Sequence, residues 1–403
     1  MLLDVLGAGL LLVAALMLVP ASVLLAQVIA AVLPGRSSSD DAAPAATLAR
    51  PRVAVLVPAH DEAVGIAAAL RSMHAQLEPG DRLVVVADNC SDDTARVAAA
   101  AGAEVIERRS LEQRGKGYAL DFGVRHLEAA PPEVVLIVDA DCELHPGSLD
   151  RLAQLCVQTG RPVQALDLMQ APPDAGLKTR IAAFAWAVKN HARPLGSWRM
   201  GLPCQLMGTG MAFPWALIRG APLASGHIVE DMRLGLDLAA TGAAPLFCPQ
   251  ALVTSLFPSH AQGIAEQRAR WEQGHLGVIV AQGPRMLMRA IVQRRPALAA
   301  MVLDLCVPPL TLLVLVLVLQ VAADLIVFAF GGGAIALGLA VAALALVVAA
   351  VGLAWWRFGQ RIVSIGELLG APLYALGKLP MYARFFRRGK REWVRARRDD
   401  GHD

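Results

Sequence analysis

The sequence has little charge and few cysteines for its length. Only 18% of its 403 residues are charged, and the formal net charge of +3 is too small to indicate binding to nucleic acid. The six cysteines form no Cys-x-x-Cys pair and no Cys/His cluster with zinc spacing, so we expect reduced thiols and no structural zinc. The glycine-rich motifs of dinucleotide dehydrogenases and P-loop enzymes are also absent, which argues against both classes.

Apolar residues are abundant instead, at 56% of the chain, and most of the excess lies at the two ends. Residues 5–33 contain no charged residue, and this run exceeds the about 20 residues that a helix needs to cross a membrane. The alternative is a secretory signal peptide, whose apolar core is shorter and follows a basic start, whereas Asp4 stands here. We therefore predict a retained transmembrane helix over 1–34 and a flexible Ser/Asp/Ala/Pro-rich linker over 35–51.

The C-terminal third has a second apolar region. Between residues 298 and 356 the only charges are Asp304 and Asp324, and this region predicts two transmembrane helices, roughly over 298–320 and 334–356. Asp304 is a candidate polar contact near an acceptor path, with helix packing as the alternative.

The segments on either side of this region are more polar. Residues 284–297 mix apolar and arginine residues, as an interfacial helix does. Residues 357–403 predict an interfacial or re-entrant segment and a basic tail. A fourth span over 362–386 would separate the arginine-rich tail from the middle domain, against the positive-inside rule. We therefore expect a multi-pass protein of the cytoplasmic (inner) membrane, with its middle domain in the cytoplasm.

Residues 52–283 alternate between β-rich and helical patterns. This alternation predicts an α/β domain with a mostly parallel sheet flanked by helices. The expected strands are Val53–Val57, Leu83–Ala87, Glu104–Glu107 and Val134–Val138, and the expected helices are Ala63–Ala75, Asp92–Ala101 and Gly115–Leu127.

Acidic residues follow three of these strands. Asp61, Asp88 and the pair Asp139 and Asp141 stand where ligands bind in parallel sheets, at the carboxyl ends of strands. Asp139-Ala140-Asp141 suits Mg²⁺ or Mn²⁺ bridging a diphosphate, although a solvated turn has the same composition. Asp88 could accept a hydrogen bond from a ribose hydroxyl or a uracil edge. Lys116 could reach a phosphate or the base; the alternative is a solvated surface lysine.

Two later motifs carry further candidates. Glu230 and Asp231 stand at the start of a helical pattern, where a carboxylate caps the helix or serves as general base for a sugar hydroxyl. Arg270 could pair with a diphosphate, and Trp271 offers a flat face for a sugar ring. The alternative is a surface arginine beside a core tryptophan.

These motifs stand in a recognisable order. Asp88, Asp139-x-Asp141, Glu230-Asp231 and Gln267-x-x-Arg270-Trp271 resemble the D, DxD, ED and QxxRW set of membrane-embedded family 2 glycosyltransferases, the branch of cellulose, chitin, hyaluronan and poly-N-acetylglucosamine synthases. The resemblance implies a GT-A fold, a UDP-sugar donor, Mg²⁺ or Mn²⁺, and inversion at the anomeric carbon by single displacement.

The resemblance also assigns roles to residues. Asp61 and Asp88 would contact the nucleotide, Asp139 the diphosphate, and Asp139 with Asp141 the metal. Asp231 would be the catalytic base, and Arg270 would join the donor site. Glu230 and Trp271 would face the acceptor.

The sequence departs from this branch in two ways. Val229 replaces the threonine that usually precedes Glu-Asp, and three predicted spans are fewer than a secretion channel needs.

From the resemblance, the expected function is sugar transfer to a growing or lipid-linked glycan in polysaccharide biosynthesis. The alternative is single addition to a membrane lipid, as in glucosylceramide synthases, which the layout also resembles. A non-enzymatic scaffold would show decayed motifs. The sugar transferred, and whether a second copy or a secretion partner takes part, stay open.

Overall fold

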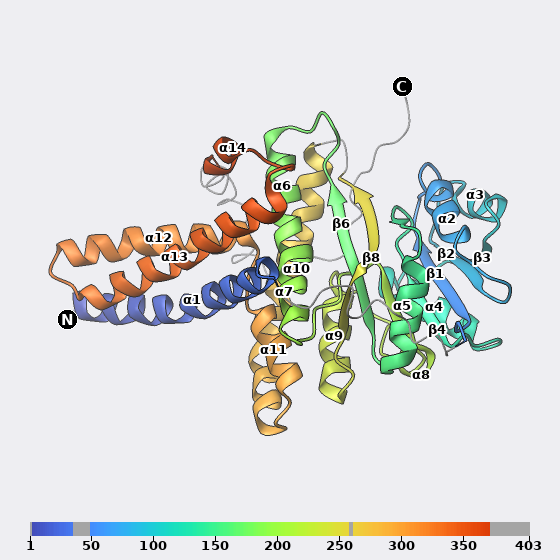
Figure 1. Cartoon of the computed structure of the whole chain (residues 1–403), viewed down its shortest axis with the longest axis horizontal. Helices are drawn as coiled ribbons and strands as arrows, with labels where there is room; N and C mark the ends of the chain where they lie inside the picture. Colours follow the sequence, from blue (N-terminus) through green and yellow to red (C-terminus); the bar gives the residue numbers. More distant parts are fainter. Residues whose placement is uncertain (1, 35–48, 258–260, 371–403) are drawn as a thin grey trace.

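The computed structural model describes residues 2–34, 49–257 and 261–370. Figure 1 shows an α/β part at one side and three long helices that project from it at the other. The predicted linker, most of the 362–386 segment and the basic tail lie outside the described residues, apart from 49–51 and 362–370.

The α/β part is built on one sheet of eight strands. Their order is β3-β2-β1-β4-β7-β6-β8-β5. The pairs β1–β2, β2–β3, β1–β4 and β6–β8 are parallel, whereas β7 is antiparallel to both β4 and β6. The sheet is thus mixed, because β7 enters it in the opposite direction, whereas the first four strands form the parallel half that we expected. The strands are β1 (Val53–Ala59), β2 (Arg82–Asp88), β3 (Glu104–Arg108), β4 (Val134–Ile137), β5 (Glu143–Leu144), β6 (Val163–Gln170), β7 (Met211–Pro214) and β8 (Leu246–Leu256).

Helices cover both faces of the sheet. Val53, Val55 and Val57 of β1 pack on one side, and Ala54 and Leu56 pack on the other, because successive side chains of a strand alternate. The first side is covered by α2 (Ile66–His74), α3 (Thr94–Ala100) and α5 (Ser148–Thr159), and the second by α4 (Lys116–Leu127), α8 (Trp215–Ile218) and α9 (Glu230–Thr241).

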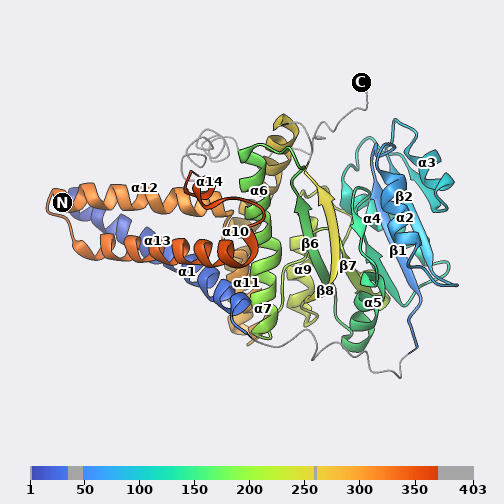
Figure 2. The same ribbon diagram turned by 45° about the horizontal axis from the view of Figure 1, so that its top comes forward.

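A layer of helices separates the sheet from the three long helices. In Figures 1 and 2, α6, α7, α10 and α11 lie across the direction of the long helices α1, α12 and α13, which run side by side. The elements of this half are α1 (Leu2–Val32), α6 (Leu177–Ala187), the π-helix η1 (Val188–Ala192), α7 (Arg193–Arg199), α10 (Ala261–Val292), α11 (Pro296–Leu305), α12 (Leu310–Ala329), α13 (Ala334–Ala354), the π-helix η2 (Trp355–Gly359) and α14 (Ile365–Leu369).

Three helices in the described part of the chain are long and apolar enough to cross a membrane: Leu3–Val32, Leu310–Ala329 and Ala334–Gly359. The expected span over 298–320 is wrong in its bounds, because α11 ends at Leu305 and α12 begins only at Leu310. Pro308 and Pro309 lack the N–H that an α-helix needs, so one continuous helix cannot run through this point and the two helices are separate.

The expected interfacial helix over 284–297 does not exist as a separate element. Helix α10 runs from Ala261 to Val292 and includes Pro284, so the boundary drawn at residue 283 falls inside a continuous helix. The chain turns only at Arg294, whose φ of 52° ends the helix, and Pro296 begins α11.

A buried polar network joins α1 to the helical layer. The Asp304 carboxylate accepts hydrogen bonds from Gln27 Nε2 and from Arg193 Nη2, each at 2.7 Å. Gln27 Nε2 also donates to Ser197 Oγ at 3.1 Å. Because buried charges require such pairing, this network indicates that Asp304 serves helix packing and not an acceptor path.

Gly196 marks the closest approach between α1 and α7. A Cβ atom at this position would lie 1.8 Å from the backbone oxygen of Gln27. The backbones of the two helices are therefore in direct contact here, and only glycine fits. We therefore predict that Gly196→Ala destabilises the protein, by about 1–3 kcal/mol or more, as overpacking does. Gly277→Ala is the matched control, since a Cβ there meets nothing within 4 Å and alanine favours the helix. Thermal unfolding in detergent should show a lower midpoint for the first variant only; equal midpoints would contradict the contact.

Candidate active site

The polar ends of β1, β2 and β4 meet at one edge of the sheet because these strands are parallel neighbours. A cavity of about 300 Å³ opens there, between this edge, the start of α9 and helix α10. Eight of the nine residues predicted from the sequence line it: Asp88, Lys116, Asp139, Asp141, Glu230, Asp231, Arg270 and Trp271. Side chains from widely separated parts of the chain therefore face one space.

Asp139 and Asp141 lie directly after β4, on the turn that leads out of the sheet. Together with the buried Cys142 they place three candidate ligand atoms within 4.8 Å of one another. Asp139 N–H donates to Thr209 Oγ1 at 3.1 Å, which fixes the turn. Mg²⁺ and Mn²⁺ prefer oxygen ligands, so the two carboxylates fit such an ion, whereas the thiol, whose pKa is raised by burial, does not.

Lys116 begins α4 and contacts the same acidic pair. Its ammonium group forms an ion pair with Asp139 and donates to the backbone oxygen of Gly208 at 2.8 Å. Burial acts to lower the pKa of Lys116, but the carboxylates of Asp139 and Glu230 outweigh it and raise that pKa, so the side chain stays charged. The cavity therefore contains a charged ammonium group beside the Asp139 carboxylate.

Asp88 ends β2 and is buried. Its Oδ1 accepts from Arg108 Nη1 at 2.6 Å and from Asn89 Nδ2 at 3.0 Å, while its backbone oxygen is 2.6 Å from His60 Nδ1. Arg108 was missed by sequence reasoning, although it stands at the end of β3, beside β2. The ion pair holds the Asp88 carboxylate in one orientation at the wall of the cavity.

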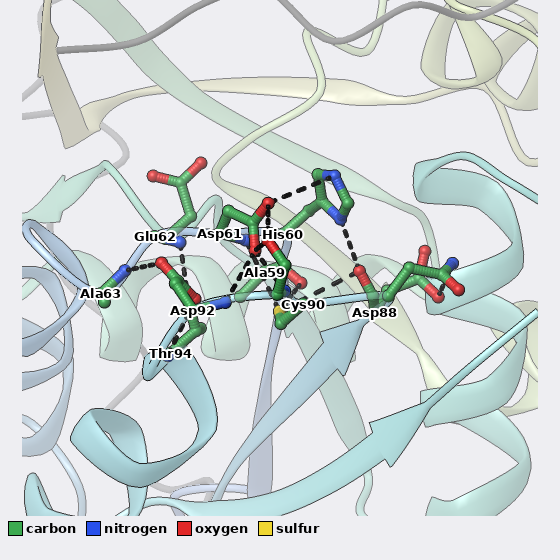
Figure 3. Close-up of polar contacts among 11 residues, drawn as sticks. Ala59, His60, Asp61, Glu62, Ala63, Asp88, Cys90, Asp92 and Thr94 are labelled. Atoms are coloured by element: carbon green, nitrogen blue, oxygen red, sulfur yellow. Dashed lines mark hydrogen bonds and ion pairs between the residues drawn. The ribbon is translucent and has the colours of Figure 1, made fainter. Parts of the chain in front are cut away.

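Asp61 is the predicted residue that the cavity does not include. Its φ of 53° turns its side chain toward the loop after β2, where Oδ1 accepts from the backbone N–H of Ser91 at 2.6 Å. Figure 3 shows this carboxylate beside Cys90 and Asp92, on the far side of His60 from Asp88. Asp61 thus joins the loops that follow β1 and β2, and its expected contact with a nucleotide stays a prediction.

Glu230 and Asp231 form the first turn of α9 and face the cavity. Burial raises the pKa of Glu230 to about 8, and the neighbouring Asp231 adds to this shift. Burial also raises the pKa of Asp231, although the N–H of Met232 and the charge of Lys189 act against it. A carboxylate with a raised pKa is suited to take a proton near neutral pH.

Three further residues of this site have no motif in the sequence. Asp167 on β6, and Trp186 and Lys189 at the join of α6 and η1, line the same cavity. Burial raises the pKa of Asp167 to about 8, and Asn190 Nδ2 donates to its carboxylate at 2.9 Å. Burial lowers the pKa of Lys189. Lys189 directly follows the apolar run 181–188, and this was the signal that could have identified the position. In the structure it stands on a π-helix, and π-helices are frequent at functional sites.

Arg270 and Trp271 reach the cavity from α10. The Trp271 ring packs against that of Trp186 with a centroid distance of 5.1 Å and an interplanar angle of 47°. The side chain of Gln267, the first residue of the QxxRW motif, lies outside the described part. The two tryptophans form part of the cavity wall on the side of the helical layer.

This combination defines a class of protein. A mixed sheet covered by helices on both faces, with carboxylates from β2, β4 and α9 around one cavity, is the GT-A fold of glycosyltransferases. A solved mannosyltransferase from Pyrobaculum calidifontis, in complex with GDP-Man and Mn²⁺, shares this fold with a TM-score of 0.53. It is 21% identical, and the match covers 94% of this chain and 99% of the solved one.

The family follows from the sequence comparison. The family described as "Glycosyltransferase like family 2" matches residues 51–274, more than half of the chain, and the chain belongs to this family. An uncharacterised glycosyltransferase of Mycobacterium tuberculosis is 36% identical over 122 residues, which cover 28% of this chain and 51% of that protein. The probable glycosyltransferase YdaM of Bacillus subtilis is 25% identical over 248 residues, or 57% of this chain and 56% of YdaM.

The chain thus spans about half the length of the curated relatives it matches. Membership of family 2 and the GT-A fold are confirmed, whereas the cellulose or chitin synthase branch stays a prediction.

Proposed function

We propose that this protein transfers a sugar, with inversion, from a UDP-sugar to a growing or lipid-linked glycan at the cytoplasmic face of the membrane. The observation that carries the proposal is the convergence of eight predicted residues on one cavity, next to helices that are apolar enough to span a bilayer. The Pyrobaculum structure was solved with GDP-Man and Mn²⁺, which supports a nucleoside diphosphate sugar and a divalent metal here too.

Each group of side chains has a part in this reaction. Asp88 is placed to accept a hydrogen bond from the nucleoside, and Lys116 and Arg270 to hold the diphosphate. Asp139 and Asp141 would hold Mg²⁺ or Mn²⁺, which when bound neutralises the departing diphosphate. Trp271 offers its ring to the acceptor, and Glu230 a hydrogen bond.

Asp231 takes the proton. The acceptor hydroxyl attacks the anomeric carbon while its proton passes to the Asp231 carboxylate, and the bond from that carbon to the diphosphate oxygen breaks. The oxygen keeps the electron pair, so UDP leaves, and the new glycosidic bond forms on the opposite face of the sugar. One displacement inverts the configuration.

A specific observation also favours the second candidate, single addition to a membrane lipid. An apolar pocket adjoins the cavity beside α1 and α12. The described chain has three candidate spans, which is fewer than we expect for a secretion channel.

The experiment that tests the proposal uses purified protein in lipid nanodiscs with Mn²⁺ and a panel of sugar nucleotides that includes UDP-sugars and GDP-mannose. Mass spectrometry then measures released nucleotide and products. A ladder of products supports polymerisation, and one added sugar supports the lipid candidate. Release from GDP-mannose alone would overturn the UDP assignment, and no release from any donor would contradict the enzyme itself.

A further inference from the structure

An apolar pocket lies between α1, α6, α10 and the turn that joins α11 to α12. Its lining includes Leu24, Ala182, Ala185, Val188, Phe257 and Pro309. Leu24 belongs to one candidate span, and Leu310, which also lines the pocket, is the first residue of another. The walls of the pocket are therefore partly made by the helices that we expect to enter the bilayer.

The pocket adjoins the active-site cavity, and the two spaces share lining residues. Trp186, Lys189 and Trp271 line both spaces. Trp186 also packs edge-on against Phe257, with ring centroids 6.4 Å apart. Tryptophan rings have an apolar body and one polar N–H, and they are enriched where apolar and aqueous surroundings meet. The aromatic group thus marks the boundary between the two spaces.

The two sides of this boundary differ in polarity. The pocket side is mostly apolar; of its charged lining residues, Arg193 forms a 2.7 Å ion pair with Asp304, and the others are Lys189 and Glu272. Burial lowers the pKa of His275 to about 3, so this imidazole is uncharged. On the cavity side stand the carboxylates of Glu230 and Asp231. A ligand that fills both spaces must be apolar at one end and hydrogen-bonding at the other.

We infer that the pocket holds the hydrocarbon chain of a membrane lipid whose hydroxyl-bearing head is the sugar acceptor. This inference rests on the proposed function and names its acceptor class. The chain enters from the bilayer between α1 and the start of α12, and the head passes Trp186 and Trp271 toward Asp231. The hydroxyl is the group that loses its proton to Asp231 when the glycosidic bond forms. The apolar walls, their origin in candidate spans and the position of the pocket beside the cavity that holds Asp231 favour this occupant.

The test fills the pocket with a side chain. Ala185→Leu adds three carbons to its wall without weakening α6, because leucine is a good helix former. Ala349→Leu makes the same change on the exposed face of α13 and serves as the matched control. Acceptors are alkyl glucosides of increasing chain length, used below their micelle concentrations with protein in nanodiscs. Donor affinity is measured separately by titration with a UDP-sugar and Mn²⁺.

We expect kcat/KM of the unaltered protein to rise about fourfold for each added methylene until the pocket is filled. Ala185→Leu should lower kcat/KM for the long-chain acceptors by about 10–200-fold, with donor affinity and short-chain acceptors little changed. Partition into the nanodisc also favours long-chain acceptors, but this effect is the same for every variant. The control Ala349→Leu should therefore show the same dependence on chain length as the unaltered protein. Equal loss with short and long chains, or no loss, would overturn the inference.

A second readout does not depend on turnover. A hexadecyl glucoside with a diazirine in its chain should, after irradiation, label peptides that contain Leu24, Phe257 or Pro309, and Ala185→Leu should remove this labelling. Labelling confined to other surfaces, or none, would overturn the inference even if the glucosides were not acceptors. Failure of donor binding would instead count against the proposed function, so the two failures are distinguishable.

Discussion

Asp231→Asn should reduce sugar transfer by roughly 10²–10⁴-fold, the contribution of a positioned general base. Asparagine has the same shape but cannot accept the proton of the acceptor hydroxyl. The side chain is half-buried in the first turn of α9, and its partial burial raises its pKa, which suits proton transfer near neutral pH. Because the change leaves the donor side of the cavity intact, affinity for the UDP-sugar should stay within a few-fold of the original.

The same helix supplies the control. Asp237 lies on α9, outside the active-site cavity, and its nearest ionic partner is Arg233 at 4.0 Å. Asp237→Asn should therefore transfer sugar at close to the original rate. Rates from radiolabelled donor, together with donor titrations, check both variants. Equal turnover of Asp231→Asn and Asp237→Asn would contradict the base assignment, and loss of donor affinity with Asp231→Asn would reassign it to binding.

Removal of divalent metal should abolish transfer, with a loss of at least about 10²-fold, because the charge of the leaving diphosphate is then neutralised by protein groups alone. Chelation followed by addition of Mn²⁺ or Mg²⁺ should restore the rate. Asp139→Asn and Asp141→Asn should each raise the metal concentration needed for half the maximal rate, since each replaces a charged carboxylate by a neutral amide, which is a weaker ligand for these ions.

A second acidic group serves as the comparison. Asp61, Cys90 and Asp92 also bring candidate ligand atoms within 4.8 Å of one another, but Asp61 and Asp92 lie outside the cavity lining. Asp92→Asn should leave the metal dependence unchanged. If Asp92→Asn shifted the metal requirement and Asp139→Asn did not, the metal site would be misplaced.

The acidic strand ends could be predicted because their signal is local. Asp88, Asp139 and Asp141 each follow a short apolar run, and parallel strands bring their carboxyl ends to one edge. The start of α9 was predictable in the same way, because Glu230 and Asp231 precede a helical pattern. Their meeting in one cavity needed the resemblance as well, since nothing local links α9 to β4.

Other features depend on contacts between distant segments. Lys189 and Trp186 reach the cavity because η1 and α6 pack beside β6. The sequence of these two elements has the pattern of an ordinary apolar helix and does not predict that packing. The direction of β7 depends on pairing with both β4 and β6. Asp61 lies outside the lining of the cavity, and its left-handed φ could not be inferred from composition. The break at Pro308 and Pro309 was visible in the sequence and was overlooked.

The central claim is that the carboxylates around this cavity bind one sugar nucleotide. Its most direct test is a crystal structure of the protein with UDP and Mn²⁺, in which anomalous scattering locates the metal. The account predicts Mn²⁺ between the diphosphate and the carboxylates of Asp139 and Asp141, with the nucleoside toward Asp88. A nucleotide bound on another surface, or a metal held away from Asp139 and Asp141, would contradict it.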